Sequence, residues 1–432
     1  MAHDPAIFSP EERLERTKLE RLQLERLQAL FLRLRSKVAF YGERLNGTSP
    51  PRSLEDLATL PFTLKSDFRD TYPLGLLAVD TPALRRIHAS SGTTGTPTIG
   101  AYSQRDLDIW GEVCARCLAA AGLHRGELFQ VAWGYGLFTG GLGMHVGAER
   151  LGACVVPASS GNTARQMQLL EALPVTGIGC TPSYALLLAE RFRHEKRKPQ
   201  ALRIAVCGAE AWTVEMRGEL EELLGVTATN IYGLTEIIGP GVAQECAAAK
   251  AGLHVFEDHF LPEIVDMTTG EPVPDGRLGE LVLTTLTRDA MPVLRYRTGD
   301  ITRITREPCS CGRTQARIDW IVGRVDDMIT VRGINVFPTA IEEVVLSFDE
   351  LTPNYRILVD RPHGGLDQLT VEVEHALGAQ IDPTALRAAV ERKLAETLTI
   401  SLDVRILAPM ALERVEVGKV KRVIDNRTVS LR

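Results

Sequence analysis

Between residues 85 and 240, short apolar runs alternate with stretches that have the period of an amphipathic helix, and this alternation restricts the possible folds more than any other feature. The apolar runs lie at residues 129–132, 154–157, 177–181 and 203–207. Gly or Pro follows each run, and helical patterns follow the last two runs, at residues 183–191 and 214–224. Strands that alternate with helices form a largely parallel sheet covered by helices. The sequence therefore predicts an α/β domain with layered sheets.

The pattern becomes β-rich further along the chain. Residues 252–320 contain strand-like runs at 280–284 and 301–304, set among Gly, Pro and Asp turns. We expect these strands to complete the large domain.

The last part of the chain has a mixed α+β pattern. Strands are predicted at residues 356–359, 369–373 and 404–407, and helices at residues 338–346 and 383–398. Asp382 is the expected N-cap of the last helix. About 108 residues are enough for an independent small domain. We therefore expect a large N-terminal α/β domain over residues 1–323 and a small α+β domain over residues 324–432, divided at the polar segment 323–327.

Composition limits the partners of the chain. Its 432 residues are too many for one hydrophobic core, which agrees with more than one domain. The net charge of −6 gives no general attraction to nucleic acid or to an anionic membrane. No apolar run reaches the roughly 18 residues that span a bilayer, and we expect no signal peptide. Eight cysteines without a regular framework are typical of reduced thiols, so we expect a cytoplasmic protein with no nucleic acid or membrane partner.

Residues 11–35 carry leucines at helical spacing among many Arg and Glu residues. This pattern predicts an amphipathic helix with opposite charges at helical spacing. Such a helix could bind a membrane or a partner. We favour a helix that packs on the surface of its own domain and keeps a solvated charged face.

The segment of residues 90–98 has the densest concentration of candidate binding residues. It reads Ser90, Ser91, Gly92, Thr93, Thr94, Gly95, Thr96, Pro97 and Thr98. Glycines leave backbone N–H groups unobstructed and hydroxyls add donors, which suits a flexible loop around the phosphates of a nucleotide. The Gly-Lys-Ser/Thr ending of a Walker-type P-loop is missing. The alternative is a plain polar turn.

Further motifs favour the phosphate-binding interpretation of this segment. In residues 230–236, Glu236 could hold Mg²⁺ and Thr235 could bind a phosphate oxygen. Asp300 ends a second motif, residues 295–300, and suits the two hydroxyls of a ribose. Residues 323–327 and 417–421 supply Arg, Asp and Lys near the small domain. Each motif alone could be a turn or a solvated charge cluster, but their joint occurrence in this order indicates a nucleotide-dependent enzyme.

The order of these motifs resembles the superfamily of adenylate-forming enzymes, which includes acyl-CoA synthetases, nonribosomal adenylation domains and luciferases. Within it the chain resembles the phenylacetate–CoA ligase type, through the segments at residues 134–143, 147–152, 180–185, 257–260 and 332–338. The resemblance runs from about residue 20 to the C-terminus. It implies an enzyme that uses ATP to turn a carboxylic acid into acyl-AMP, releases pyrophosphate, and transfers the acyl group to coenzyme A with release of AMP.

The resemblance also implies roles for single residues. Lys419, after Gly418, is the cation at the α-phosphate, with Lys421 as the other candidate; Glu236 holds Mg²⁺ and Thr235 assists. Asp326 is the hinge of a mobile C-terminal domain. The implied nucleotide-binding residues are Ser90, Ser91, Gly92, Thr93, Thr94, Gly95, Gly208, Ala209, Glu210, Tyr232, Gly233, Asp300 and Arg324. One departure is Thr96, which stands where such ligases often have Lys, so a positive charge beside the pyrophosphate is absent.

The acyl pocket should be apolar with an aromatic wall. Tyr135, Phe138, Ile237 and Pro240 are its candidate residues. Because no cationic residue falls at an obvious place for a second carboxylate, aryl acids such as phenylacetate or a benzoate fit best. Alternatives are the loading of a carrier protein, the adenylation of a deazaflavin-type cofactor, or a non-catalytic nucleotide-binding protein. The expected partners are thus an aryl acid, ATP, Mg²⁺ and coenzyme A, and a homodimer is the habit of the subfamily.

A separate group of residues suggests a structural zinc site. Cys309 and Cys311 lie in a tight turn that ends in Gly, a common half of a zinc knuckle. Cys246 and His254 could supply the other two ligands. The alternative is four unrelated side chains. The pair Cys114 and Cys117 lies in a helical pattern and is interpreted as core.

Overall fold

The computed structural model describes residues 7–90, 97–325, 329–331, 334–361, 366–398, 400–414 and 422–427. Its α-helices are α1 (Arg16–Lys37), α2 (Ala39–Arg44), α3 (Lys65–Asp70), α4 (Gln104–Ala120), α5 (Thr139–Leu151), α6 (Thr163–Ala172), α7 (Pro182–His194), α8 (Val214–Leu224), α9 (Pro338–Leu346) and α10 (Pro383–Leu398). Short 3₁₀ helices span Pro10–Arg13, Glu55–Thr59 and Thr81–Ala83.

The strands of the large domain are β1 (Leu84–Ala89), β2 (Ile99–Ser103), β3 (Leu128–Val131), β4 (Cys154–Val156), β5 (Val175–Cys180), β6 (Ile204–Gly208), β7 (Thr227–Leu234), β8 (Gly239–Glu245), β9 (Leu253–Val255), β10 (Phe260–Val265), β11 (Gly279–Thr285), β12 (Tyr296–Thr302), β13 (Ile304–Thr305), β14 (Arg317–Ile318) and β15 (Gly323–Arg324). Those that follow are β16 (Ile329–Val331), β17 (Ile334–Val336), β18 (Leu351–Asp360), β19 (Gln368–His375), β20 (Asp403–Leu407) and β21 (Val423–Asp425).

A sheet of nine strands forms the centre of the large domain, in the order β13-β14-β9-β8-β7-β6-β5-β3-β4. The strands from β4 to β7 are parallel, and β7 then turns back into the antiparallel β8. Alternate side chains of β6 enter two different cores: Ile204 and Val206 face the core that includes α4, while Ala205 and Cys207 face the core of α6, α7 and α8. The predicted α/β domain is confirmed, but its central sheet is mixed, because four strand pairs are parallel and four are antiparallel.

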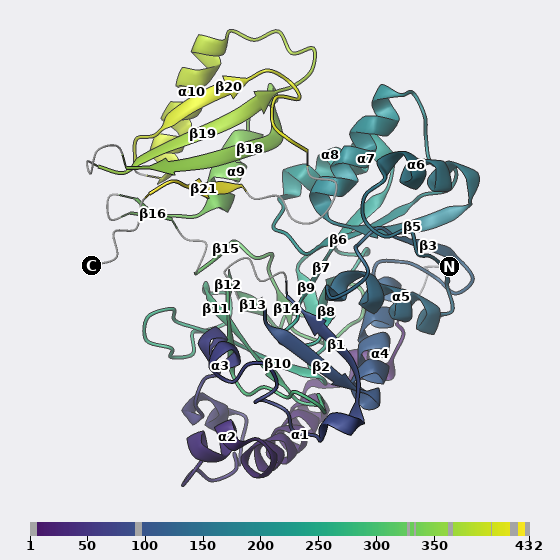
Figure 1. Cartoon of the computed structure of the whole chain (residues 1–432), viewed down its shortest axis with the longest axis vertical. Helices are drawn as coiled ribbons and strands as arrows, with labels where there is room; N and C mark the ends of the chain where they lie inside the picture. The colour runs from purple at the N-terminus through teal and green to yellow at the C-terminus, as the bar shows by residue number, and fades with distance from the viewer. Residues whose placement is uncertain are drawn as a thin grey trace.

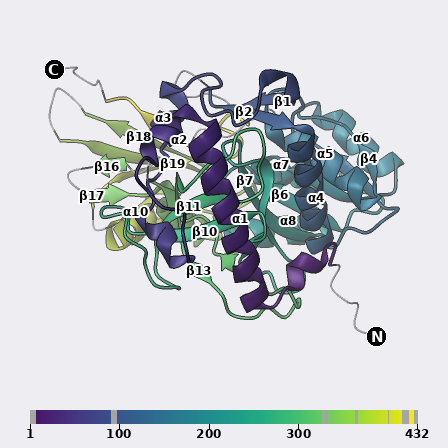
Figure 2. The same ribbon diagram turned by 90° about the horizontal axis from the view of Figure 1, so that it is seen from below.

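The β-rich segment forms a second sheet, and the long N-terminal helix packs beside it. Strands β10, β11, β12 and β15 are joined in this order and are antiparallel. Figure 2 shows α1 lying across the molecule next to β10 and β11. The helix buries Leu19, Leu27, Leu30, Phe31 and Leu34. The expected domain-surface helix is therefore confirmed.

The small domain has its own core. Strands β20, β19, β18 and β21 form a sheet with α9 and α10, and their apolar residues make a separate cluster. This domain lies at one end of the long axis, with α9 in contact with α8 (Figure 1). Asp382 Oδ1 accepts the backbone N–H groups of Thr384 and Ala385, which confirms the N-cap of α10. Arg324 still belongs to β15 of the large domain, and the boundary at residues 323–324 remains a prediction.

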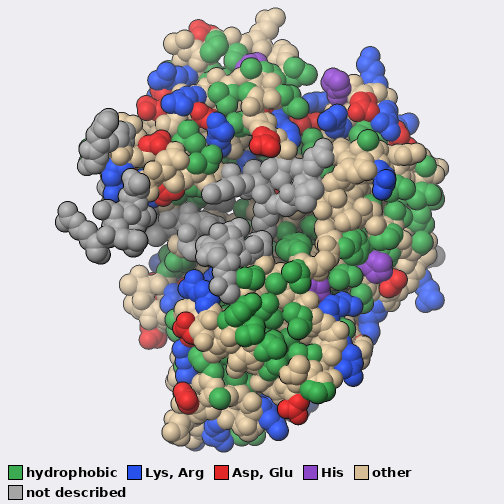
Figure 3. Space-filling model, in the orientation of Figure 1, with side chains coloured by type: hydrophobic (Ala, Val, Ile, Leu, Met, Phe, Trp, Pro, Cys, Tyr) green, Lys and Arg blue, Asp and Glu red, His purple; other side chains and the backbone are tan. Residues whose placement is uncertain are grey.

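On the face shown in Figure 3, Lys and Arg side chains alternate with Asp and Glu. Among the described helices, none is both long and apolar enough to cross a bilayer.

Helices α4 and α5 approach each other closely because glycine faces the contact. A Cβ atom at Gly143 would lie 2.6 Å from the Trp110 ring, and one at Gly147 would overlap the Cβ of Cys114 and approach its carbonyl carbon to 2.8 Å. These two glycines thus set the distance between the helices that cover one face of the sheet.

We expect Gly147→Ala to lower the free energy of unfolding by about 1–3 kcal/mol, because the added methyl overpacks the α4–α5 contact. Gly218→Ala in α8 is the control, since nothing lies within 4 Å of the added atom. That change should raise stability by about 0.5–1 kcal/mol through helix propensity. Urea unfolding of both variants checks the difference, and equal effects would refute the close contact.

Candidate functional site

The base of the expected phosphate loop is closed by two hydrogen bonds. The Ser90 N–H donates to the Thr98 carbonyl at 2.9 Å, and the Thr98 N–H donates to Ser90 Oγ at 2.9 Å. Strands β1 and β2 run antiparallel into and out of this base. The other predicted loop residues, namely Ser91, Gly92, Thr93, Thr94 and Gly95 with the neighbouring Thr96, lie outside the described residues.

The turn between β7 and β8 carries Thr235 and Glu236. Both are buried, with exposed fractions of 6% and 9%. Gly100, just after the phosphate loop, lies against Thr235, because a Cβ there would come within 3.2 Å of the Thr235 carbonyl oxygen. Arg288 donates to the carbonyl of Glu236 at 2.6 Å and also to that of Ile237, which fixes the turn. The fold therefore brings the loop base and the predicted Mg²⁺ ligand together.

Asp300 lies at the centre of a buried cluster. Its carboxylate accepts the Tyr232 hydroxyl at 2.5 Å and Arg324 Nη1 at 2.6 Å. Thr298 binds both members of the Asp300–Arg324 pair. Its Oγ1 accepts the Asp300 N–H at 3.0 Å, and its carbonyl accepts Arg324 Nη2 at 3.2 Å. Burial, followed by the charge of Asp300, raises the pKa of Tyr232 well above its ordinary value. Tyr232 therefore stays a neutral donor.

Tyr296 connects this cluster to the Mg²⁺ candidate. Burial raises its pKa well above the usual range, and the nearby carboxylates of Glu236 and Asp300 act in the same direction. The Tyr296 hydroxyl therefore remains protonated beside Glu236.

The end of β6 supplies the remaining nucleotide candidates. A Cβ at Gly208 would overlap the Ile231 carbonyl on β7, so only glycine fits there. Ala209 follows with a φ of 75°, in the left-handed region. Glu210 Oε1 then accepts the Ser183 N–H at 2.7 Å at the start of α7. Gly233 lies on β7 opposite Pro240, whose Cα would be 2.7 Å from an added Cβ.

The candidate acyl-pocket residues come from two neighbouring segments. Tyr135 and Phe138 precede α5, and the Tyr135 hydroxyl pairs with His145 Nδ1 at 3.1 Å. Burial raises the pKa of Tyr135 to about 12. Ile237 is fully buried, and the Pro240 carbonyl accepts Trp110 Nε1 at 2.8 Å.

These two segments meet where α5 begins. A Cβ at Gly239 would lie 2.8 Å from Thr139 Cβ, which brings the first residue of α5 against the β7–β8 turn. A cavity of about 50 Å³ lies elsewhere, between α7 and the small domain, with Ser183, Leu187, Tyr355 and Arg414 in its wall. It is smaller than the roughly 300 Å³ that a ligand site needs.

Two predicted functional residues cannot be compared with the structure. Lys419 and Asp326 lie outside the described residues, as does Lys421. Their assignments remain predictions from the sequence.

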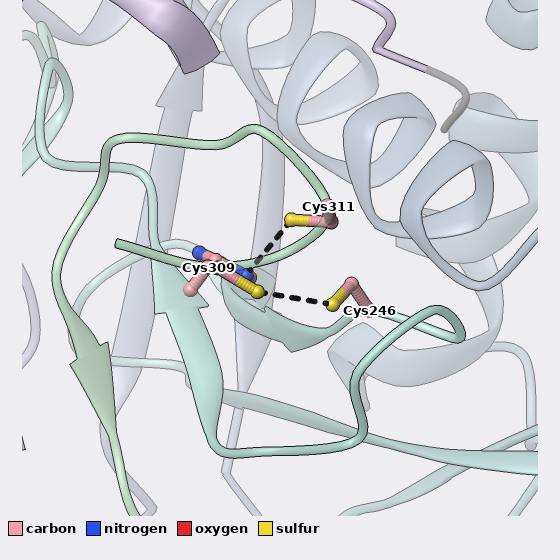
Figure 4. Close-up of side chains that lie close together, drawn as sticks. Cys246, Cys309 and Cys311 are labelled. Atoms are coloured by element: carbon pink, nitrogen blue, oxygen red, sulfur yellow. Dashed lines mark hydrogen bonds between the residues drawn. The ribbon is translucent and has the colours of Figure 1, made fainter. Parts of the chain in front are cut away.

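Cys246, His254, Cys309 and Cys311 converge although they come from three separate segments. Their ligand atoms all lie within 4.8 Å of one another. The two sulfur atoms of Cys246 and Cys309 are 3.8 Å apart, and Cys311 Sγ is 3.4 Å from His254 Nε2 (Figure 4). Ligands at the corners of a tetrahedron about 2.3 Å from a metal lie about 3.8 Å apart. The geometry therefore fits a tetrahedral ion.

Electrostatics within this group favours the thiolate form of Cys309 and Cys311 but not that of Cys246, whose pKa is raised by its hydrogen bond to Cys311 and by burial. A hydrogen bond from His254 lowers the pKa of Cys309, and bonds from Cys246 and His254 lower that of Cys311. Burial opposes charge on His254, but the two thiols outweigh it and raise its pKa. Cys114 and Cys117 are buried in α4, as predicted.

The motif at residues 257–260 lies in a buried ionic network rather than at the nucleotide site. Glu257 accepts both Arg16 Nη atoms at 2.9 Å. Asp258 binds Arg116 of α4 at 2.8 and 3.1 Å. Arg313, next to the cysteine turn, binds Glu12 at 2.7 Å. The pairs of Arg16 and Glu12 fasten the N-terminal segment to the β-rich part of the large domain, and the Asp258–Arg116 pair fastens α4 to it.

Sequence reasoning missed Tyr296, Thr298 and Arg288 as site residues. The first two stand inside the motif that ends in Asp300, and their place beside that carboxylate was a signal available in the sequence. Arg288 lies 52 residues after Glu236 and follows a strand end, so only the fold reveals its contact.

The chain matches two family models. The model described as AMP-binding enzyme matches residues 82–286, and the one described as AMP-binding enzyme C-terminal domain matches residues 333–427. It is 48% identical to a phenylacetate-coenzyme A ligase of Thermus thermophilus over 98% of this chain and 100% of the relative. It is 46% identical to the phenylacetate-coenzyme A ligase of Escherichia coli over 88% of this chain and 87% of the relative.

Solved structures show the same fold. A 2-hydroxyisobutyryl-CoA ligase in its postadenylation state, in complex with an acyl-AMP, superimposes with a TM-score of 0.91 at 26% identity, covering 99% of this chain and 94% of the neighbour. The same ligase in its thioesterification state, with coenzyme A, gives 0.72 at 28% identity, covering 96% and 91%. Because one sequence accounts for both neighbours, the lower score reflects a different arrangement of its parts rather than a different fold.

The Asp300 cluster leads to a stability prediction. Asp300→Asn should lower the free energy of unfolding by about 1–3 kcal/mol, because the buried Asp300 side chain loses its charge-assisted bond to the half-buried Arg324. Asp319→Asn is the control, since the Asp319–Arg303 pair at 2.8 Å is largely exposed and should contribute less than about 0.5 kcal/mol. Chemical denaturation measures both values. Equal losses of unfolding free energy in the two variants would mean that the Asp300 cluster contributes no more to stability than an exposed ion pair.

Proposed function

Because the chain belongs to the phenylacetate–coenzyme A ligase family of AMP-binding enzymes, we propose that its own substrate is an aryl acid such as phenylacetate or a benzoate. The enzyme is an AMP-forming acid–CoA ligase. It uses ATP to activate the acid as acyl-AMP with release of pyrophosphate, and it then transfers the acyl group to coenzyme A with release of AMP.

The observation that best supports this function is the joining of three predicted nucleotide elements. The Ser90–Thr98 base, the Thr235–Glu236 turn and the Asp300 cluster come from distant segments but meet through Gly100 and Tyr296. In the proposed complex the phosphates lie between the loop and Thr235, and the ribose hydroxyls donate to Asp300. Gly208, Ala209 and Glu210 follow the neighbouring strand β6 and border the same nucleotide.

Glu236 is the proposed Mg²⁺ ligand. A carboxylate is a hard oxygen ligand of the kind that Mg²⁺ prefers. Among the described residues, Glu236 has no Lys or Arg ion-pair partner that would neutralise it, so its charge is available to a cation. When bound, Mg²⁺ would offset negative charge on the phosphates. With Thr96 in place of Lys, the hydroxyls and N–H groups of the loop carry more of this role.

Lys419 and Asp326 complete the proposed mechanism. The acid and the α-phosphate are both anionic, so a cation must reduce their repulsion while the acid oxygen attacks the α-phosphorus. We assign this role to Lys419 in the small domain. A turn at Asp326 would then withdraw Lys419 and admit coenzyme A. The two arrangements of the 2-hydroxyisobutyryl-CoA ligase support such a turn.

The acyl acceptor and the oligomeric state are also proposals. The four full-length relatives in the comparison are coenzyme A ligases, which favours coenzyme A over a carrier protein or a deazaflavin-type cofactor. Tyr135, Phe138, Ile237 and Pro240 remain the proposed acyl-pocket residues. A homodimer in the cytoplasm is proposed from the sequence, and the eight free cysteines are in keeping with a reducing compartment.

We propose further that Cys246, His254, Cys309 and Cys311 hold a structural zinc ion. Three thiolates and one imidazole fill a tetrahedral shell and leave no position for water, so the ion would stabilise the fold without activating a nucleophile. The ion would join the end of β8, the start of β9 and the turn that Arg313 fastens to Glu12. Its place is beside the ionic network, because Arg313 contacts both Cys311 and Glu12.

The proposed function predicts pyrophosphate release that depends on an aryl acid. Purified enzyme with ATP and Mg²⁺ should release pyrophosphate with phenylacetate or a benzoate, and coenzyme A should turn this into steady formation of the thioester. Lys419→Ala should slow acyl-AMP formation on the order of 10²–10³-fold, yet leave the transfer from supplied acyl-AMP largely intact. Lys393→Ala, on the exposed side of α10, is the matched control. Equal damage to both half-reactions would exclude the assigned role of Lys419, and a lack of activity with every aryl acid would exclude the substrate class.

The zinc proposal predicts about one zinc ion per chain in protein purified without chelator. Cys311→Ser should lose the ion and lower the melting temperature, because a bound metal contributes to folding. Cys154→Ser is the control, since Cys154 is exposed and far from the group in sequence. The Michaelis constant for ATP should change little in either variant. Wild-type protein that carries no zinc when purified without chelator, or a Cys311→Ser variant that keeps the wild-type melting temperature, would contradict the site.

A further inference from the structure

His88 is a buried polar residue to which neither the proposed chemistry nor the sequence motifs assign a role. It lies on β1, two residues before Ser90, and is 1% exposed. Its Nδ1 atom lies 3.0 Å from the Leu137 carbonyl oxygen. The Ala89 N–H donates to the same oxygen at 2.9 Å. One carbonyl is thus held twice by the strand that leads into the phosphate loop.

The position of Leu137 makes these two bonds important. Leu137 lies in the loop between β3 and α5, between the proposed pocket residues Tyr135 and Phe138. Its side chain is 65% exposed, so apolar burial does not hold the tip of this loop. The carbonyl bonds from His88 and Ala89 are therefore the main described interactions that hold the loop at this point.

The His88 ring also reaches the turn that carries Glu236, through two aromatic side chains. It stands edge-on to Tyr102 and Trp110, at ring-centre distances of 5.5 and 5.3 Å. These two rings stack on each other at 5.0 Å. The Tyr102 hydroxyl donates to the Ile238 carbonyl at 2.9 Å, and Trp110 Nε1 donates to the Pro240 carbonyl at 2.8 Å. His88 thus connects the phosphate loop, the acyl loop and the β7–β8 turn.

The protonation of His88 follows from these contacts. Burial lowers its pKa, so the ring is neutral near pH 7. A carbonyl oxygen only accepts, so the proton lies on Nδ1 and Nε2 carries a lone pair. Nε2 is buried and has no partner among the described residues. A phenyl ring would fill the same space without this unpaired atom, so packing alone does not account for a histidine here.

We propose that His88 is a positioning residue for acyl-AMP formation, which holds the acyl loop in register with the phosphate loop through the bond from Nδ1 to the Leu137 carbonyl. The inference rests on the proposed adenylation reaction. In that step the acid and ATP are separate molecules held by different loops, and a displacement of about 1 Å can cost on the order of 10²-fold in rate. In the second step the acyl group and AMP are already bonded, so their register no longer depends on the two loops.

Three variants distinguish the effect of the hydrogen bond to the Leu137 carbonyl from the effect of the aromatic packing of the His88 ring. His88→Asn places an amide N–H near the former Nδ1 atom, whereas His88→Gln places it near Nε2; both lose the aromatic packing. His88→Phe keeps the ring and loses the bond. We expect His88→Asn to retain acyl-AMP formation within about threefold of wild type. His88→Gln and His88→Phe should lower kcat/KM for the acid by about 10–100-fold, with a higher KM for the acid.

The second half-reaction is the decisive readout. The rate of thioester formation from supplied acyl-AMP should stay within about threefold of wild type in all three variants. In acyl-AMP the acyl group and AMP are already bonded, so the two loops do not have to align them. If Asn and Gln fall equally, or if both half-reactions fall together, the inference is wrong. If the two amide variants do not fold, His88→Phe with wild-type melting temperature and full acyl-AMP formation would also overturn it. A wild-type enzyme that releases no pyrophosphate with any acid would instead refute the proposed function.

Discussion

The carboxylate of Asp300 adds direct side-chain bonds between three segments that strand pairing and the shared core already bring together. Through Tyr232 it is bonded to the nine-stranded sheet, and through Arg324 to the strand that leads to the small domain. Asp300 itself lies on the four-stranded sheet. A buried carboxylate needs such donors, because burying a charge without partners is costly. The same donors therefore fix both sheets and the start of the linker in one arrangement.

Much of the fold followed from local patterns. Helices α8, α9 and α10 have the bounds that the apolar period predicts, and the N-cap at Asp382 is where the residue types place it. The motif residues Thr235, Glu236, Tyr232 and Asp300 are also brought together as the sequence suggested. Motifs and periods are local properties, so a single sequence is enough to read them.

Contacts between distant segments could not be read in this way. Arg116 and Asp258 are 142 residues apart and form a buried ion pair, but nothing in the sequence marks the two as partners. His88 and Leu137 meet because strand β1 passes the loop before α5, and a backbone carbonyl leaves no mark in a sequence. The cysteine group could be predicted in part, because three thiols and an imidazole that lie close together are typical of a metal site.

The glycine contact between α4 and α5 has a consequence for how such an enzyme can diversify. Gly143 and Gly147 leave no space behind α5, so the helix cannot retreat to enlarge the proposed acyl pocket. New acid preferences must then arise from side chains at the front of the helix and in the loop before it. Selection on substrate range would therefore act on a few loop positions such as Tyr135 and Phe138, while the helix pair behind them stays unchanged.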